Sequence, residues 1–216
     1  MSQELGRMEK PSANEFKAER KLFFVPLVFL PRKPEGDLQD RVSSYWEQVE
    51  AHVTNLESKL GNVKKVYHEL VPVGGENGAK AIEELNTGSH SIVQARLATG
   101  AELQPLEEAE LLAEFMDWSR CLAVGLQSQK AIRLVYDSYL DAQKRRDEHM
   151  AKCIDETLGA REVGLLLMRE GHGVQFPSDV QVFYVAPPAL DELKRWLRDR
   201  QAESQSASDQ ASGEPD

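Results

Sequence analysis

Cysteine is scarce in this chain, which has 216 residues but only Cys121 and Cys153. The two thiols form no CxxC pair and no group with histidine at zinc-finger spacing, so we expect neither disulfides nor structural zinc to hold the fold. Both cysteines fit the role of small apolar residues in a reducing compartment. We therefore expect a cytoplasmic protein with no metal and no cofactor.

Long hydrophobic runs are also missing. The longest, residues 22–30, contains Pro26 and falls far short of the ~20 apolar residues of a membrane-spanning helix. The first 20 residues mix charged and polar side chains and lack the apolar core of a secretory signal. We expect no contact with a membrane.

Positive charge is the third deficit, because 26 Lys and Arg stand against 36 Asp and Glu and give a formal net charge of −10. Binding along a phosphate backbone needs clustered positive charge, so this balance argues against nucleic acid as a partner. The best local cluster, Lys144 to Arg146, is followed at once by Asp147 and Glu148. Such alternation is typical of a solvated helix face.

What is present suits a globular chain, since 41% of the residues are hydrophobic and 29% are charged. Neither end carries a periodic apolar stripe. We expect a flexible N-terminal tail over residues 1–20, a single α/β domain over 21–200 and a disordered C-terminal tail over 201–216.

Four apolar segments predict strands, over residues 22–29, 63–73, 163–168 and 180–185. Pro26 lies inside the first and cannot donate to a ladder, so we place that strand at an edge or a bulge. The connection between the last two strands is short for a parallel crossover, which favours a local antiparallel pair.

Apolar residues at three- and four-residue spacing predict helices over 38–60, 78–85, 89–97, 106–124, 129–158 and 188–200. The order of elements favours an α/β fold class. We predict a layered domain with a small four-stranded mixed sheet, covering helices, and a helical insertion over about 79–158 that forms a long helical hairpin or arm.

The helix over 129–158 would measure roughly 45 Å, longer than a small domain is wide. Its stretch 141–148 offers only Ala142 to a core, so it is either a solvated bend or part of an arm between subunits. The residues that we expect at such an interface are Tyr136, Tyr139, Leu140 and Gln143.

One candidate for chemistry follows the third predicted strand. Arg169, Glu170 and His172 lie there, with Asp179 a few residues on. Open α/β sheets bind ligands beyond the carboxyl ends of their strands, and a histidine between glycines can reach a substrate there. A structural or surface histidine is the alternative.

A second candidate follows the second predicted strand, where Gly74, Gly75, Asn77 and Gly78 precede a helix. Backbone N–H groups at such a place can approach an anion. The spacing matches no phosphate-binding motif and Glu76 would repel a phosphate, so an ordinary turn is the alternative.

Other signatures are missing. The acidic residues between 107 and 117 have no ExxH partner motif, and their position at the start of a helix has a simple cause in the helix dipole. The chain has no GxSxG, and no serine has a recognisable histidine partner.

Two functions remain open. The first is a non-catalytic protein-interaction or regulatory module that binds a protein partner or a second copy, self-associating through the long helix as a homodimer. The alternative is a small-molecule-binding enzyme or sensor with a pocket at the strand ends near His172. That pocket requires the loop of His172 and the turn of Gly74 to converge.

Overall fold

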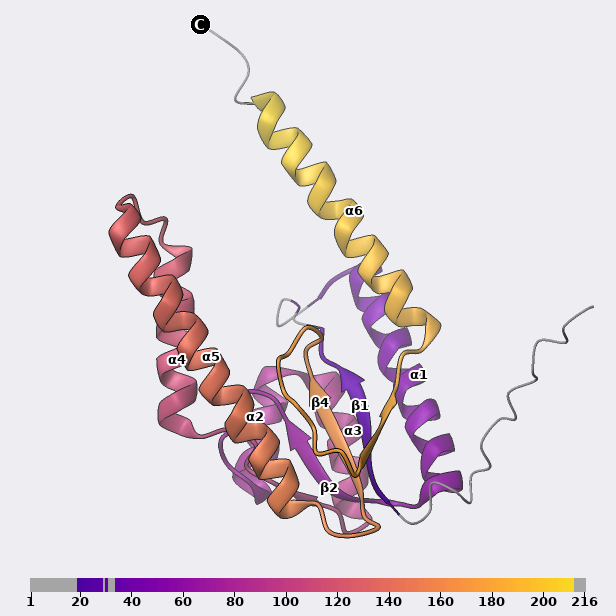
Figure 1. Ribbon diagram of the computed structural model, residues 1–216. Helices are drawn as coiled ribbons and strands as arrows, with labels where there is room; N and C mark the ends of the chain where they lie inside the picture. The colour runs from indigo at the N-terminus through magenta and orange to yellow at the C-terminus, as the bar shows by residue number, and fades with distance from the viewer. Residues whose placement is uncertain (1–18, 29, 31–33, 212–216) are drawn as a thin grey trace, which may run out of the picture.

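The structure is a computed structural model that describes residues 19–28, 30 and 34–211, with side chains as far as residue 203. Its described part contains six helices and five strands (Figure 1). The strands are β1 (Arg20–Pro26), β2 (Val63–His68), β3 (Glu102–Leu103), β4 (Val163–Met168) and β5 (Val180–Tyr184). The helices are α1 (Asp37–Leu60), α2 (Gly75–Leu85), α3 (Thr87–Ala98), α4 (Ala109–Ala123), α5 (Gln129–Thr157) and α6 (Pro188–Ala211).

The strands form one parallel sheet in the order β3-β2-β4-β1-β5. The α/β class is confirmed, but the predicted four-stranded mixed sheet is wrong. The strand that was not predicted is β3, which has only two residues and leaves no pattern in the sequence. Strands β4 and β5 do not form a hairpin, because both pair with β1, which lies between them.

Pro26 is the last residue of β1, which is paired on both sides rather than at an edge. The pairing with β5 ends at Phe24, two residues earlier, so the missing N–H of the proline falls beyond that ladder. The expected edge position of this strand is therefore wrong. Pro26 nevertheless lies at the end of β1, where its missing N–H interrupts no pairing with β5.

Different elements cover the two faces of the sheet. Helices α1, α2, α3 and α6 pack on one face, which we call the α1 face. Helix α5 and the 169–179 connection pack on the other, the α5 face. Alternate residues of β1 serve the two cores, since Phe23 and Val25 face α1 while Leu22 and Phe24 face α5. Burial on both sides explains the continuous apolar runs of β1 and β4.

Each connection between strands runs over one of these two faces. Those leading to β2 and β3 run over the α1 face, and those leading to β4 and β5 run over the α5 face. This arrangement keeps all crossovers of one hand. The chains leaving the neighbouring strands β2 and β4 therefore diverge to opposite faces, and a crevice is expected at their carboxyl ends.

Helix α5 has two parts. Its second half packs on the sheet through Met150 and Ile154, and its first half pairs with α4. In Figure 1 this hairpin of α4 and the first half of α5, which we call the arm, projects beyond the carboxyl edge of the sheet. The described residues include no helix long and apolar enough to cross a membrane.

Helix α6 continues to Ala211, beyond residue 200 where the predicted helix ends. Its first turns pack on α1, and Figure 1 shows the rest extending away from the sheet. The expected N-terminal tail lies outside the described residues up to residue 18, and the end of the C-terminal tail lies outside them from residue 212.

Candidate functional site at the carboxyl edge

Charged side chains fill the crevice between β2 and β4. Arg146 of α5 donates through Nε to Oε2 of Glu107 at 2.8 Å and through Nη2 to Oε1 of Glu69 at 3.1 Å. The Nε of Arg169, just after β4, lies 3.1 Å from the same Glu69 oxygen. The carboxylates also accept from backbone N–H groups, Glu69 from Arg169 and Glu107 from Leu70.

This network is dry, since the side chain of Arg146 is only 1% exposed. Burial opposes the charge of Arg146, but Glu107 and Glu69 outweigh it and hold the pKa of Arg146 above its ordinary value. The stretch 141–148 is therefore solvated on one side only, because Ala142, Arg146 and Asp147 are buried where the arm meets the sheet while Lys144 and Arg145 are exposed. A buried ion network anchors the arm.

Phe115 of α4 completes this anchor. The guanidinium of Arg146 lies 4.7 Å from the centre of the Phe115 ring, and that of Arg169 lies 5.3 Å from it. Both distances suit cation–π attraction. The network therefore joins both helices of the arm to the ends of β2 and β4.

His172 lies beside this network, over β1. Its ring packs between those of Phe24 and Phe176, with centroid distances of 5.2 and 5.5 Å. Its Nδ1 atom is buried and has no hydrogen-bond partner among the residues that the structure describes, and burial lowers the pKa of His172. Next to it, burial raises the pKa of the Asp147 carboxylate, which accepts from the backbone of Gly173.

The other predicted residues of this loop point elsewhere. Glu170 accepts from Tyr184 and pairs with Lys194, on the side of α6. Asp179 pairs with Arg20 at 2.6 Å, at the amino ends of β1 and β5 and hence at the opposite end of the sheet from His172. The structure does not bring Asp179 to His172.

The glycine turn lies at the far edge of the sheet. A Cβ on Gly74 would come within 2.7 Å of the Leu103 carbonyl, and one on Gly78 within 2.3 Å of the Val73 carbonyl. These glycines let α2 pack closely against β3. Gly75 has a left-handed φ of 58° and Asn77 is exposed. The chain leaves this turn for α2 on the α1 face, whereas His172 packs on Phe24 on the α5 face, so the two loops do not converge.

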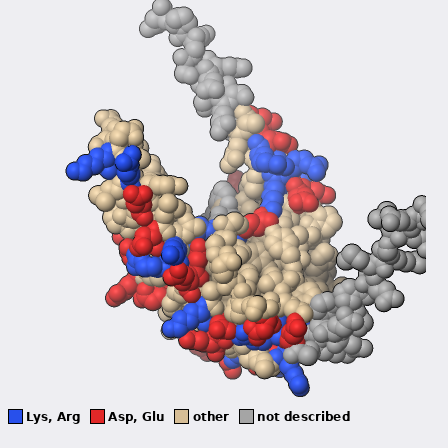
Figure 2. Space-filling view, in the orientation of Figure 1, with Lys and Arg blue, Asp and Glu red and all other residues tan. Residues whose placement is uncertain are grey.

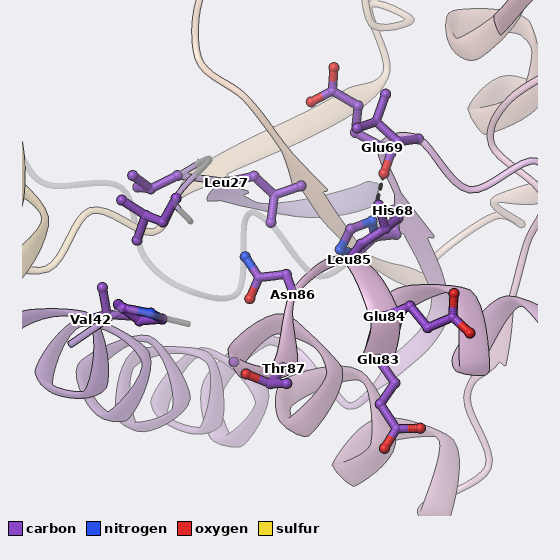
Figure 3. Close-up of a pocket in the computed structure, with 14 residues that line it drawn as sticks. Leu27, Val42, His68, Glu69, Glu83, Glu84, Leu85, Asn86 and Thr87 are labelled. Carbon is purple, nitrogen blue, oxygen red and sulfur yellow. Dashed lines mark hydrogen bonds between the residues drawn. The ribbon is translucent and has the colours of Figure 1, made fainter. Parts of the chain in front are cut away.

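A cavity of about 150 Å³ opens instead on the α1 face of the carboxyl edge (Figure 3). Its walls come from the segment after β1, from α1, from the end of β2 and from the junction of α2 and α3. The lining residues are Leu27, Val28, Leu30, Pro34, Val42, His68, Glu69, Leu70, Glu83, Glu84, Leu85, Asn86, Thr87 and Gly88.

His68, the last residue of β2, borders this cavity and was missed as a candidate. Its Nδ1 lies 2.7 Å from the carbonyl of Glu69, which can only accept, so Nδ1 carries the proton. Its Nε2 lies 3.0 Å from the Ser89 hydroxyl, whose single proton can go either to this ring nitrogen or to the backbone carbonyl of Asn86, also 3.0 Å away. Ser89 and His68 are 21 residues apart in the chain, and this spacing matches no motif that would have predicted their contact.

The pair is not arranged as a catalytic base and nucleophile. Burial lowers the pKa of His68 to about 4, far from the value near 7 that suits a general base. Ser89 is fully buried and does not line the cavity. His68, held in place by Ser89, therefore offers a neutral wall to the cavity.

The arm presents a different surface. Leu134 is 65% exposed, Tyr136 51% and Leu140 44%, and Val124 at the end of α4 is exposed as well. In Figure 2 the outer part of the arm shows more uncharged surface than its base, where charges of both signs gather.

The four predicted interface residues separate into two kinds. Tyr139 packs inside the hairpin, with its ring 5.3 Å from that of Phe115. Tyr136 is exposed, and Leu140 and Gln143 line a cleft between α5 and Gly173 of the β4–β5 loop. Leu140 and Gln143 thus lie beside the β4–β5 loop, near Gly173 and Gln175 rather than beside the predicted loop residues.

Within the described part of the chain, no three His, Cys, Asp or Glu side chains gather as a metal site would require. Comparison with protein-family models, curated proteins and solved structures found no match.

Proposed function

We propose that this chain is a non-catalytic interaction module that self-associates through the arm. The observation that carries the proposal is the exposure of Leu134, Tyr136 and Leu140 on a hairpin that projects from the sheet (Figure 1). Exposed large apolar side chains favour an interaction surface where they lie together, and Tyr136 and Leu140, four residues apart, share one side of α5.

A second copy suits the surface because its charges are self-complementary. Arg133, Leu134, Asp137, Leu140 and Asp141 recur at three- and four-residue spacing and share one side of α5. If two α5 helices pair antiparallel about Asp137, Leu134 of each copy meets Leu140 of the other. Arg133 then meets Asp141 in the same symmetric way, as a two-fold interface requires.

The filled crevice supports an interaction role over catalysis. In an open parallel sheet the divergence of β2 and β4 is where a ligand is expected. Here Glu69, Glu107 and Arg146 occupy that place and bind one another. What they achieve is a rigid base for the arm.

Light scattering of the full chain tests the proposal. The wild type should show a mass of twice 24.3 kDa at micromolar concentration. A variant with Tyr136→Asp and Leu140→Asp should remain at the monomer mass, because charges would be buried in an apolar contact.

Leu85→Asp is the matched control, because Leu85 is 45% exposed but lies on α2, away from the arm. It should leave the dimer mass unchanged. The proposal is contradicted if the wild type is a monomer, or if Leu85→Asp dissociates the dimer as much as the double variant does.

A further inference from the structure

The cavity in Figure 3 has the position of a ligand site. It lies between the ends of β1 and β2, and hence over the end of β4, which separates them in the sheet. Ligands of parallel α/β domains bind at this carboxyl edge. The other side of the same edge is filled by the Arg146 network, so this cavity is the open part of it.

Its size limits the ligand. A volume of about 150 Å³ is that of an apolar cavity that holds benzene. The apolar wall comes from Leu27, Val28 and Val42. A ligand with one ring, or a branched chain of similar size, fills this space.

Its charge favours a neutral ligand. His68 is held by Glu69 and Ser89 as a neutral ring, and the Glu69 carboxylate faces Arg146 and Arg169. Figure 3 shows the Glu83 and Glu84 side chains directed away from the interior. A charged ligand would therefore lose its water without finding a counter-ion inside.

Apart from His68, the uncharged polar side chains of the lining are Asn86 and Thr87, and we consider the amide of Asn86 for the recognition of a ligand. Asn86 caps α3, and its Oδ1 accepts from the backbone N–H of Ser89 at 3.0 Å. Its Nδ2 has no partner among the described residues, and Figure 3 shows the amide turned toward Leu27. An amide N–H donor needs an acceptor, such as a carbonyl oxygen.

We propose that this cavity binds a small uncharged molecule whose apolar body lies against Leu27, Val28 and Val42 and whose carbonyl oxygen accepts from Asn86 Nδ2. The site is independent of the arm and of self-association.

Titration of the full chain with acetophenone, followed by amide and methyl NMR signals, tests the site. The ketone should shift the signals of Leu27, Val42 and Asn86 in a saturable way. Benzoate has the same number of heavy atoms but a charge, and cumene has the same number but no acceptor. Both should bind at least about tenfold more weakly, by the loss of one buried hydrogen bond or the burial of an unpaired charge.

Two variants localise the binding. Asn86→Asp keeps the oxygen that caps α3 but replaces the donor by a charge, so the affinity for acetophenone should fall at least about tenfold. Val42→Phe should fill the cavity and abolish the shifts. The matched controls are Asn77→Asp and Val73→Phe, which alter exposed residues outside the cavity and should change nothing.

The proposal is overturned if acetophenone causes no saturable shifts at the cavity, if benzoate binds as well, or if Asn86→Asp binds like the wild type. Should Val42→Phe fail to fold, the Asn86→Asp result decides alone, because that variant retains the helix cap.

Discussion

The carboxyl edge of the sheet is filled with charged side chains on one face and open on the other. On the α5 face, Arg146 and two glutamates fill the crevice with paired charges. On the α1 face, the neutral His68 borders a cavity. The closed side gives the arm a rigid base, and the open side leaves space for a molecule. One part of an edge where ligands are expected can thus hold the arm in place, while a cavity lies beside it.

The largest effect should come from breaking the closed side. Arg146→Met leaves Glu107 buried without a cation and Glu69 with only the partly exposed Arg169, which should reduce the free energy of unfolding by about 3 to 5 kcal/mol. Urea denaturation measures the change. The neighbouring Arg145→Met removes only exposed ion pairs with Glu114 and Asp141 and should cost far less. Equal losses in the two variants would contradict a buried anchor.

On the open side, acid should destabilise the fold through His68. Because burial lowers its pKa from 6.5 to about 4, the folded state prefers the neutral ring. The resulting stability is complete above pH 6.5 and is lost as the pH falls through 4, by roughly 3 kcal/mol in all.

Denaturation of wild type and His68→Gln at several pH values checks this. The variant should lose less stability on acidification, keeping the part due to His172, whose pKa burial also lowers. His52→Gln, at an exposed position on α1, should retain the full slope. An unchanged slope in His68→Gln would show that His68 is protonated as readily in the folded chain as in the unfolded one.

The smallest effect concerns the arm that the closed side supports. The antiparallel pairing proposed for α5 brings Asp137 of two copies together, and like charges at such a distance cost a few tenths of a kcal/mol. Asp137→Asn should therefore tighten self-association about twofold, as measured by sedimentation at several concentrations. Weaker association of this variant would rule out that register.

Much of the fold could be predicted because its signals are local. The apolar runs of β4 and β5 and the helical spacing of α5 need no distant partner to be recognised. Strand order and β3 could not be predicted, since pairing depends on residues far apart and two residues carry no periodicity. Helix α6 outlasts its apolar stripe, which ends near Leu197.

The candidate site was predicted less well, for the same reason. Arg146 is charged in a charged stretch and becomes a buried anchor only through Glu107 and Glu69, which are 39 and 77 residues away in the chain. His68 meets Ser89 only because β2 ends beside the start of α3. The loop of His172 was correctly placed at a strand end, but its neighbours form a packed cluster around Phe24.

Cysteine cross-linking tests most directly whether the arm joins two copies. In a chain with Cys121 and Cys153 changed to serine, Leu134→Cys and Leu140→Cys variants are mixed and oxidised. Antiparallel pairing predicts that mixed disulfide-linked dimers form faster than dimers of either variant alone, and that a Leu85→Cys variant stays monomeric. If the mixed dimer does not exceed the others, or if position 85 links as readily, the arm is not the surface through which this chain associates.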